Sequence, residues 1–479
     1  MRGKQEQIAY AASIVPSARQ ISWQQTEFYA FIHFGVNTFT DSEWGSGHED
    51  PNVFNPTKLD CRQWARVLRS AGMRGMVLTA KHHDGFCLWP TKTTAHSVAS
   101  CRWMQGAGDV VREAADACKA YGLKFGIYLS PWDRNASCYG QGKLYDDFYM
   151  TQLRELCENY GDLFCVWFDG ACGEGPNGKK QRYDWRRYYD LVRELQPNAA
   201  ISGRGPDVRW CGNEAGICRS SEWSVVPEWH IGQHQFSELN EQNHKKIPNQ
   251  LQPSYWDLGS RRAIARAEEL IWYPAEVDVS IRDGWFYHEK QDWTVKPLQK
   301  LRDIYYASVG ANAALLLNIP PTKEGLIHPR DTETLVAFGA QLKIDFKEDL
   351  AQDSRVTASC RRDDLHAAPM CLDRNPDRFW HSGDLTDKAE LILDLGDDYD
   401  INKIVLQEHI ATGQQIERFS LWMDQNLNAE GKFKWKRLAG GTVIGYKRVC
   451  MFSERRMRRV KLVVEKTRGF ATLQSFQAY

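Results

Sequence analysis

Short apolar runs recur along the first 345 residues of the chain, and each ends within two residues of a glycine, a proline or a charged residue. The runs cover residues 28–34, 75–80, 123–129, 163–168, 199–202, 276–281 and 314–319. Runs of this length with such boundaries are typical of strands that are buried on both faces of a parallel sheet.

Amphipathic stretches separate these runs, with apolar residues near the helical period. The expected helices cover residues 62–71, 110–121, 146–160, 183–195, 293–309 and 329–342. Alternation of strand and helix indicates parallel βαβ units, and a long succession of them favours a closed barrel. An open, doubly wound sheet is the alternative, but Gly35-Val36-Asn37-Thr38 after the first strand lacks the spaced glycines of a dinucleotide site. We therefore predict an α/β fold with a (β/α)8-like TIM barrel.

The pattern changes near residue 350, where helical periodicity gives way to short alternating runs. These runs cover residues 389–395, 401–405, 419–423, 441–444, 460–464 and 472–476. Such runs, separated by turn residues, are typical of an antiparallel sandwich. The sequence thus predicts two domains, a catalytic barrel over residues 1–345 and an all-β sandwich over residues 346–479. Residues 206–265 are expected to form long loops over the barrel mouth.

Bulk composition limits the partners of the chain. Lys and Arg together number 61, as do Asp and Glu, so the net charge of zero gives no reason to expect a nucleic-acid partner. No apolar run is long enough to span a membrane and the N-terminus has no signal-type apolar core, so we expect no membrane insertion and no export signal. The compartment stays open between the cytoplasm and a trimmed secreted or periplasmic form. The 13 scattered cysteines indicate reduced thiols rather than a disulfide framework or a metal site.

Chemically active side chains lie at the ends of the predicted strands. They are His33, His82, His83, Tyr128, Asp169 and Arg204, joined by Glu43 and Trp44 from the loop after the first strand. The carboxyl ends of barrel strands meet at one mouth, where barrel enzymes carry their active sites. We therefore expect these residues to form one site, with Asp169 as the first catalytic candidate.

Two kinds of site use such a set of residues. Three histidines with an aspartate suggest a metal site, but metal-dependent barrel hydrolases typically pair two histidines across one residue of a strand, and His33 has apolar neighbours. Adjacent His82 and His83 would point to opposite faces of a continuing strand. A sugar pocket needs the same mixture of donors and acceptors beside an aromatic wall. We favour the sugar pocket, with no metal and no cofactor, and keep a metal-dependent barrel hydrolase as an alternative.

Glycoside hydrolysis needs a second carboxyl group that is protonated while the first is ionised. Glu214 lies in the irregular segment after Arg204, and Glu276 begins a predicted strand. Spacing alone does not choose between these two glutamates.

Several motifs follow one another in order between residues 20 and 345. They are Phe31-Ile32-His33-Phe34-Gly35, Ser42-Glu43-Trp44, Lys81-His82-His83-Asp84-Gly85-Phe86, Gly126-Ile127-Tyr128-Leu129-Ser130, Trp167-Phe168-Asp169-Gly170 and Leu315-Leu316-Leu317-Asn318. In this order they resemble the α-L-fucosidases of glycoside hydrolase family 29. The resemblance implies a (β/α) barrel, a fucosylated oligosaccharide or glycan as substrate, and a double displacement that retains the anomeric configuration.

The resemblance also implies roles for single residues. The nucleophile falls on Asp169, and Glu214 matches the general acid/base best, with Glu276 as the runner-up. The implied fucose-binding residues are His33, Glu43, Trp44, His82, His83, Tyr128, Arg204 and Trp285. The segment Gly212-Asn213-Glu214 is similar to the branch that acts on α-1,3- and α-1,4-linked fucose.

Residues 372–382 resemble a discoidin-type or carbohydrate-binding sandwich motif. Such a domain would either bind sugar or support the barrel, and we favour support, since no alternation indicates an exposed aromatic face. For the whole chain, a non-hydrolytic carbohydrate-binding relative is a further alternative. Asp169 with two available glutamates disfavours it.

Overall fold

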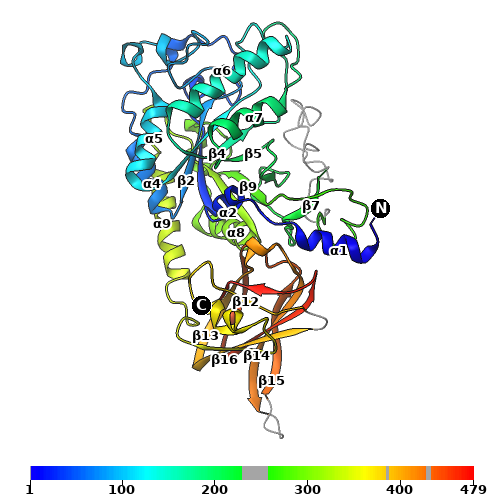
Figure 1. The fold of residues 1–479 in the computed structure, drawn as a ribbon. Helices are drawn as coiled ribbons and strands as arrows, with labels where there is room; N and C mark the ends of the chain where they lie inside the picture. Colours follow the sequence, from blue (N-terminus) through cyan, green and yellow to red (C-terminus); the bar gives the residue numbers. More distant parts are fainter. Residues whose placement is uncertain (1, 229–256, 385–387, 428–432) are drawn as a thin grey trace.

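A computed structural model of the chain describes residues 2–228, 257–384, 388–427 and 433–479. Figure 1 shows a barrel of strands and helices with a smaller sheet structure below it, and helix α9 running from one to the other. Of the stretch 206–265, residues 229–256 lie outside the described residues.

Eight parallel strands form the barrel, in the spatial order β5-β4-β3-β2-β1-β10-β9-β6. Their bounds are β1 Phe28–Ile32, β2 Gly75–Lys81, β3 Lys124–Leu129, β4 Leu163–Phe168, β5 Ala200–Gly203, β6 Arg209–Trp210, β9 Ala275–Ser280 and β10 Ala313–Asn318. Strands β5 and β6, at the two ends of this order, lie next to each other, so the sheet is nearly closed. The predicted TIM-like barrel is confirmed. The sequence pattern missed only the two-residue strand β6, which is too short to show a period.

Helices follow six of the barrel strands. They are α4 Cys61–Ser70, α5 Val110–Tyr121, α6 Lys143–Asn159, α7 Trp185–Leu195, α8 Leu298–Ser308 and α9 Pro329–Asp345. Asp60, Asp109 and Asp184 cap α4, α5 and α7, each accepting a hydrogen bond from the backbone N–H three residues later. Helix α5 ends at Gly122, whose φ of 66° is a left-handed conformation that favours glycine.

Further short elements lie outside this regular pattern. They are helices α1 Lys4–Ser13, α2 Ala18–Gln24 and α3 Val36–Thr40 and the antiparallel pair β7 Val225–Pro227 and β8 Leu270–Trp272. None of these was predicted from the sequence.

Along each barrel strand, successive side chains point in turn to the barrel interior and to the surrounding helices. In β1, Tyr29 and Phe31 belong to the interior cluster, whereas Phe28, Ala30 and Ile32 pack outward. This two-residue alternation is the reason why the strands read as continuous apolar runs.

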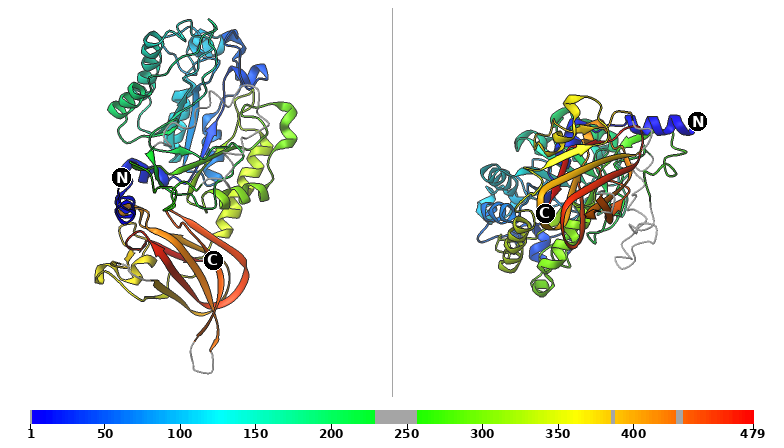
Figure 2. Two further views of the ribbon diagram at one scale, coloured as in Figure 1. Left: turned by 90° about the vertical axis from the view of Figure 1, so that its right-hand side faces the viewer. Right: turned by 90° about the horizontal axis from the view of Figure 1, so that it is seen from below.

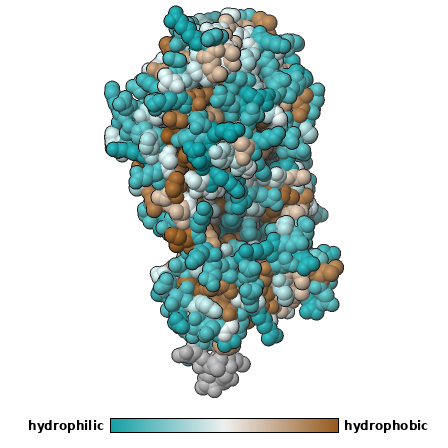
Figure 3. All heavy atoms as spheres, turned by 90° about the vertical axis from the view of Figure 1, so that its left-hand side faces the viewer, coloured by the Kyte–Doolittle hydropathy of each residue, from teal (hydrophilic) through white to brown (hydrophobic). Residues whose placement is uncertain are grey.

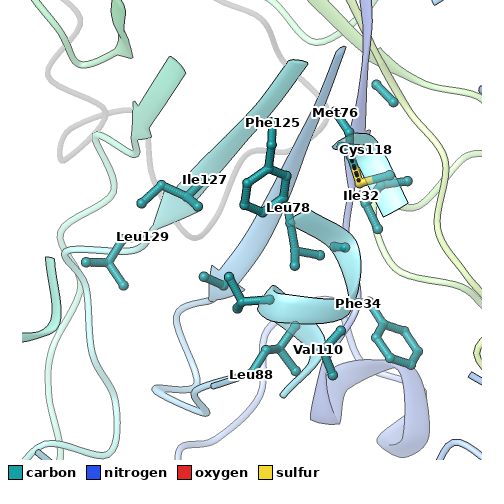
Figure 4. Packing of buried hydrophobic residues seen from close by; sticks show 14 of the residues in the cluster. Ile32, Phe34, Met76, Leu78, Leu88, Val110, Cys118, Phe125, Ile127 and Leu129 are labelled. Carbon is teal, nitrogen blue, oxygen red and sulfur yellow. Dashed lines mark hydrogen bonds between the residues drawn. The ribbon is translucent and has the colours of Figure 1, made fainter. Parts of the chain in front are cut away.

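The outer layer at β2 and β3 is drawn in Figure 4. Leu78 and Ile127 lie on the strands and Val110 on helix α5, and all three are fully buried. The Cys118 thiol of the same helix lies 3.9 Å from the sulfur of Met76 on β2. Helix α5 thus covers these two strands with closely packed apolar side chains.

The C-terminal part is built from antiparallel sheets, as the sequence predicted. Its strands are β11 Arg355–Ala358, β12 Trp380–His381, β13 Ala389–Gln407, β14 Ile416–Leu427, β15 Phe433–Gly441, β16 Arg448–Thr467, β17 Thr472–Leu473 and β18 Ser475–Ala478. The main sheet has the order β11-β13-β16-β14-β15, with β18 also on β13, and β12 pairs with β17.

The observed strands differ from the predicted runs in several places: β14 and β16 extend beyond their predicted bounds, and β11, β12 and most of β15 were not predicted. Strand β13 passes through the predicted turn at Gly396 as one strand, because a register shift between Asp394 and Tyr399 takes up the extra residues. The strand expected at 441–444 is wrong, since β15 ends at Gly441.

The sandwich contacts residues that precede barrel strands. Glu27, just before β1, accepts a hydrogen bond from the Tyr446 hydroxyl at 2.9 Å and pairs with Lys447 at 2.6 Å. Asn312, just before β10, accepts the backbone N–H of Tyr446 at 2.7 Å. The sandwich therefore lies at the amino end of the barrel, opposite the mouth, and the left-hand view of Figure 2 shows it below the barrel.

Within the described part of 206–265, the turn that carries Glu214 faces the barrel mouth, since Glu214 accepts the Trp285 indole N–H at 3.2 Å, whereas the residues around Val225 do not. Val225 packs with Ala11 of α1, Trp272 of β8 and Ile410 of the sandwich. The expectation of mouth-covering loops is therefore wrong for the residues around Val225 and Ile264, which pack on α1 and the sandwich instead. It failed because a polar composition indicates loops but not the side of the barrel on which they lie.

The surface agrees with the composition. Polar residues cover most of the face seen in Figure 3, and the apolar residues between them form small separate groups. None of the helices in the described ranges has the length and apolar character needed to cross a lipid bilayer. All 13 cysteines fall in these ranges, and each carries a free thiol.

Candidate active site

Asp169 lies at the barrel mouth, directly after β4. Its Oδ2 atom accepts a hydrogen bond from the Tyr128 hydroxyl at 2.8 Å, and its Oδ1 atom accepts the backbone N–H of Ala171 at 2.8 Å. The Nε2 atom of His83 lies 3.8 Å from Oδ2, and the aspartate side chain keeps 23% of its surface exposed. Asp169 is thus an oriented carboxyl group that a ligand can still reach.

Three buried histidines surround this carboxyl group. His33 Nδ1 lies 2.8 Å from Asn318 Oδ1, and His83 Nδ1 lies 2.7 Å from the Ser130 hydroxyl. Burial lowers the pKa of His33 and of His83 to about 4, and it lowers the pKa of His82 well below its usual value. The rings are therefore neutral at pH 7, and a neutral imidazole carries one donor and one acceptor, which suits sugar hydroxyls.

His82 has a polar atom without a partner. Its Nδ1 atom is buried and has no hydrogen-bond partner within the described ranges. The ring stacks at 5.8 Å on that of Tyr128 and lies 5.6 Å from that of His33. A ligand hydroxyl at this position would satisfy the unpaired nitrogen.

His82 and His83 do not point to opposite faces, as a continuing strand would require. Strand β2 ends at Lys81, whose ammonium group donates to Asp133 at 2.8 Å and to Gln152 at 2.9 Å. The two imidazoles follow in a turn, with ring centroids 4.1 Å apart. Both therefore reach the mouth because the two-residue alternation stops where the strand stops.

Glu43 holds the segment that carries Trp285. Its carboxylate accepts the backbone N–H of Trp285 at 2.9 Å and that of Phe286 at 3.3 Å, and it lies 2.7 Å from His288 Nε2. His288 Nδ1 lies 2.7 Å from Asp41. The hydrogen bond to Glu43, and to a smaller extent that to Asp41, raises the pKa of His288.

Tryptophans form two sides of the site. The Trp285 ring is half-buried and lies 5.1 Å from that of His33. Trp44, also half-buried, lies 5.8 Å from His83, and Trp132 lies 4.9 Å from the same imidazole. Such walls suit the apolar face of a sugar ring.

Glu214 stands in a tight turn that follows β6. The Asn213 side chain accepts the backbone N–H groups of Ala215 at 3.0 Å and Ile217 at 3.4 Å, and it donates to the Ile217 carbonyl at 2.8 Å. Gly216, with a φ of 74°, provides the left-handed conformation that this turn needs. The order Asn-Glu-Ala-Gly thus has a local structural reason, because the asparagine closes the turn that presents the glutamate.

Glu214 faces the same site. The Trp285 indole N–H donates to its Oε2 atom at 3.2 Å. The side chain is solvent-exposed, yet protein atoms crowd the carboxyl group, and this desolvation together with the charges of Asp169 and Glu43 raises its pKa to about 7. A carboxyl group of this kind is partly protonated at neutral pH and can still reach solvent.

Glu276 lies elsewhere. It is fully buried inside the barrel near the start of β9 and accepts hydrogen bonds from Tyr29, from Trp167 at 2.7 Å and from Ser202 at 2.8 Å. The strand runs on for four residues to Ser280, so the mouth is about 13 Å further along. The structure therefore does not bring Glu276 together with Asp169.

Arg204 lies beside the site. Its backbone N–H donates to the Phe168 carbonyl at 2.8 Å, and its guanidinium carbon lies 5.7 Å from the ring centre of Trp185. Arg204 is half-buried, and its guanidinium group lies over the first residue of helix α7.

Several residues of the site were missed from the sequence. They are Ser130, Trp132, Phe286, His288 and Asn318. Ser130 and Asn318 stand at strand ends, so the rule that selected Asp169 could have found them. The other three lie in loops, where no period gives a signal. Within the described ranges, no three His, Cys, Asp or Glu side chains are grouped so that they could hold a metal ion.

Comparisons with known proteins agree on one family. A family model for alpha-L-fucosidases matches residues 48–346. Alpha-L-fucosidase 1 of Arabidopsis thaliana is 40% identical over 459 residues, which cover 95% of this chain and 85% of the plant protein.

Solved structures give the same result. The crystal structure of a putative alpha-L-fucosidase from Bacteroides ovatus has a TM-score of 0.85 and 45% identity, and the match covers 100% of this chain and 76% of that one. A Ruminococcus gnavus GH29 fucosidase in complex with fucose has a TM-score of 0.82 and 28% identity, covering 98% and 95% of the two chains.

Proposed function

Because the chain belongs to the alpha-L-fucosidase family, glycoside hydrolase family 29, and is a fucoside-hydrolysing enzyme, we propose a catalytic mechanism and a linkage preference for it. It removes terminal α-1,3- or α-1,4-linked L-fucose from oligosaccharides or glycoconjugates, with retention of the anomeric configuration. Asp169 is the nucleophile and Glu214 is the general acid/base. Family membership favours neither a non-hydrolytic binding relative nor a metal-dependent hydrolase.

One observation carries this assignment. Two carboxyl groups share a site but differ in surroundings: Asp169 accepts two hydrogen bonds at 2.8 Å, and Glu214 has a pKa raised to about 7. Glycosidases need this difference, because one carboxyl group must donate a proton while the other attacks or stabilises as an anion.

The reaction proceeds in two displacements. Glu214 protonates the glycosidic oxygen as the Asp169 carboxylate attacks the anomeric carbon, so the aglycone leaves as an alcohol and a β-fucosyl ester forms. Glu214, now ionised, takes a proton from water. The water oxygen displaces Asp169 and releases α-L-fucose.

The neutral histidines bind fucose in this scheme. His33, His82 and His83 hydrogen-bond the ring hydroxyls, and the half-buried Trp285 faces the sugar's apolar side. Glu43 orients Trp285 through the two backbone N–H groups that it accepts. The Trp285 N–H bonded to Glu214 links the sugar wall to the acid/base. Tyr128, Trp44 and Arg204 complete the proposed pocket.

The linkage preference is supported by the acid/base turn. Gly212-Asn213-Glu214 is similar to the branch that cleaves α-1,3- and α-1,4-linked fucose in branched glycans, and Asn213 closes the turn with three hydrogen bonds. We expect fucosylated trisaccharides with these linkages to be cleaved faster than α-1,2-linked ones or a simple aryl fucoside.

The mechanism is tested by Asp169→Ala with azide. The variant should lose several orders of magnitude in kcat on an aryl fucoside while remaining folded, and azide should restore turnover with β-fucosyl azide as product. NMR identifies the anomer. Activity within about tenfold of wild type would remove Asp169 from the nucleophile's role. A trisaccharide panel with each linkage tests the preference separately.

A further inference from the structure

We propose that the C-terminal sandwich holds the loop that carries Glu214, here defined as residues 211–224, and that Gln414 and Thr442 are positioning residues for this acid/base. The inference rests on the proposed role of Glu214. It concerns side chains that lie at the amino end of the barrel, far along the chain from the site.

The two ends of the loop are joined by a buried ion cluster. Glu222 accepts hydrogen bonds from Arg209 at 2.7 Å and from the Arg219 guanidinium at 3.2 Å, and the latter also donates to the Cys211 carbonyl at 3.3 Å. All three charged side chains are at most 5% exposed. Although burial alone would raise the pKa of Glu222, the two arginines outweigh it and hold the pKa below its usual value. The cluster closes the loop at its base.

The returning limb of the loop, residues 220–224, contacts the sandwich. Gln414 Oε1 accepts the backbone N–H of Ser224 at 2.8 Å. The Ser221 and Thr442 hydroxyls are hydrogen-bonded to each other. Strand β16 contributes through Arg448, whose guanidinium donates to the Ser220 carbonyl at 3.0 Å. Three separate segments of the sandwich therefore contact three backbone or side-chain groups of one limb.

A buried asparagine adds a bridge between the two parts. Asn312 Nδ2 donates to the Glu222 carbonyl at 2.7 Å, while its Oδ1 accepts the backbone N–H of Tyr446 in the sandwich at 2.7 Å. The backbone N–H of Asn312 donates to the Lys447 carbonyl at 2.9 Å. The same amide group thus fixes Glu222 relative to the turn at 446–447.

The loop needs this support because it has little regular structure of its own. Strand β6 has only two residues, and no helix follows it within the described ranges. Above the limb, the turn closed by Asn213 is compact and pairs with β9 through an isolated bridge between Ala215 and Val279, so we expect a shift of the limb to displace Glu214. Misplacing a catalytic group by about 1 Å can cost up to about a hundredfold in rate.

The first test compares Gln414→Met with Gln414→Glu. Met keeps the shape but removes the acceptor for Ser224, whereas Glu keeps an acceptor. The Gln414 Nε2 atom has no hydrogen-bond partner in the described part of the chain, so Glu sacrifices no bond there. We measure kcat and KM on aryl fucosides with good and poor leaving groups, and the pH profile of each variant.

Gln414→Met should lower kcat/KM about tenfold more for poor leaving groups than for good ones, because only poor leaving groups need the acid. Its alkaline pH limb should also move, and Gln414→Glu should lie near wild type. Thr442→Val against Thr442→Ser repeats the comparison at a half-buried position, and it decides the question if Gln414→Met does not fold.

Ser420→Ala is the matched control. Ser420 is fully buried in the same sandwich, but its hydroxyl bonds Glu465 at 2.6 Å rather than the loop. It should lower the unfolding temperature without changing leaving-group dependence. Equal losses on all substrates in Gln414→Met and Thr442→Val, or no loss, would overturn the positioning role.

The variant Glu214→Ala shows whether a negative result concerns the positioning role alone or also the proposed function. If Glu214→Ala is selective for poor leaving groups and the sandwich variants are not, only the positioning role fails. If Glu214→Ala is not selective, Glu214 is not the acid, and both proposals fall.

Discussion

At the scale of single residues, the surroundings of a side chain decide which chemistry it can perform. Glu214 and Glu276 have the same side chain, but Glu276 is fully buried with three donors, whereas Glu214 is exposed with one tryptophan N–H. Of the two, Glu214 is therefore the one that we propose as the proton donor. With this proposed role, its raised pKa predicts how catalysis depends on pH.

We expect activity to fall as pH rises through about 7. The raised pKa keeps Glu214 protonated below that pH, and protonation is the state that the acid needs. The alkaline limb of kcat/KM should lie near pH 7 for substrates with poor leaving groups. It should disappear in Glu214→Gln, measured on an activated aryl fucoside. An unchanged limb in this variant would assign the titration to another group.

The buried histidines make the fold sensitive to acid. Their pKa values are lowered in the folded protein, so between pH 4 and the usual value of 6.5 the unfolded chain binds more protons, and stability decreases as pH falls through this window. For His83, which is 3% exposed, the loss by pH 5 is about 2 kcal/mol.

His83→Asn should therefore reduce the acid sensitivity. Urea unfolding at pH 7 and pH 5 gives the change in free energy of unfolding for each protein. The change should be about 2 kcal/mol smaller in the variant than in wild type. Val336→Ala, at an exposed helix position, serves as the control and should keep the wild-type change. Equal changes in all three proteins would show that His83 is not neutral in the folded state.

At the scale of elements, close helix packing supports the barrel. Helix α9 crosses the end of α4 at Gly339, where a Cβ atom would lie only 2.0 Å from the Ser70 carbonyl oxygen. Only glycine lets the two backbones approach this closely.

Gly339→Ala should destabilise the protein. Alanine favours a helix by up to about 1 kcal/mol, but the clash with fixed backbone should cost more, for a net loss of about 1–3 kcal/mol. Gly469→Ala is the matched control, because nothing lies within 4 Å of its added carbon. Denaturant unfolding measures both, and a Gly339→Ala protein as stable as the control would mean that α9 shifts freely.

At the scale of the whole molecule, polar contacts connect barrel and sandwich. Glu27 is buried between Lys447 of the sandwich and Arg74 of the barrel, at 2.6 Å and 3.7 Å. Burial alone would raise its pKa, but these two cations outweigh it and lower the pKa. The predicted division between residues 345 and 346 stays a prediction, and the contacts across it suggest that both parts unfold together.

Glu27→Gln tests this coupling. It removes the charge of the buried carboxylate that pairs with Lys447, whose side chain is 18% exposed, so we expect a loss of about 2–4 kcal/mol in free energy of unfolding. Glu324→Gln also removes one carboxylate from an ion pair, but that pair is more than half exposed and should cost less than about 1 kcal/mol. Near-UV and far-UV circular dichroism should give one transition in wild type. Separate transitions would contradict the coupling.

Local pattern determined most of the barrel and part of the site. The seven longer strands, the capped helices and the strand-end position of Asp169 follow from apolar alternation and turn residues, which depend only on near neighbours. The order of motifs also indicated the enzyme family.

Tertiary structure decided the rest. Which glutamate reaches the mouth depends on how far along β9 Glu276 lies and on the path of the loop after β6. His82 and His83 share one side because β2 ends at Lys81. The support of the Glu214 loop comes from Gln414 and Thr442, some two hundred residues away in the chain. Burial, charge and pKa are set by such distant neighbours, and no local pattern encodes which of them the closed barrel and the sandwich bring together.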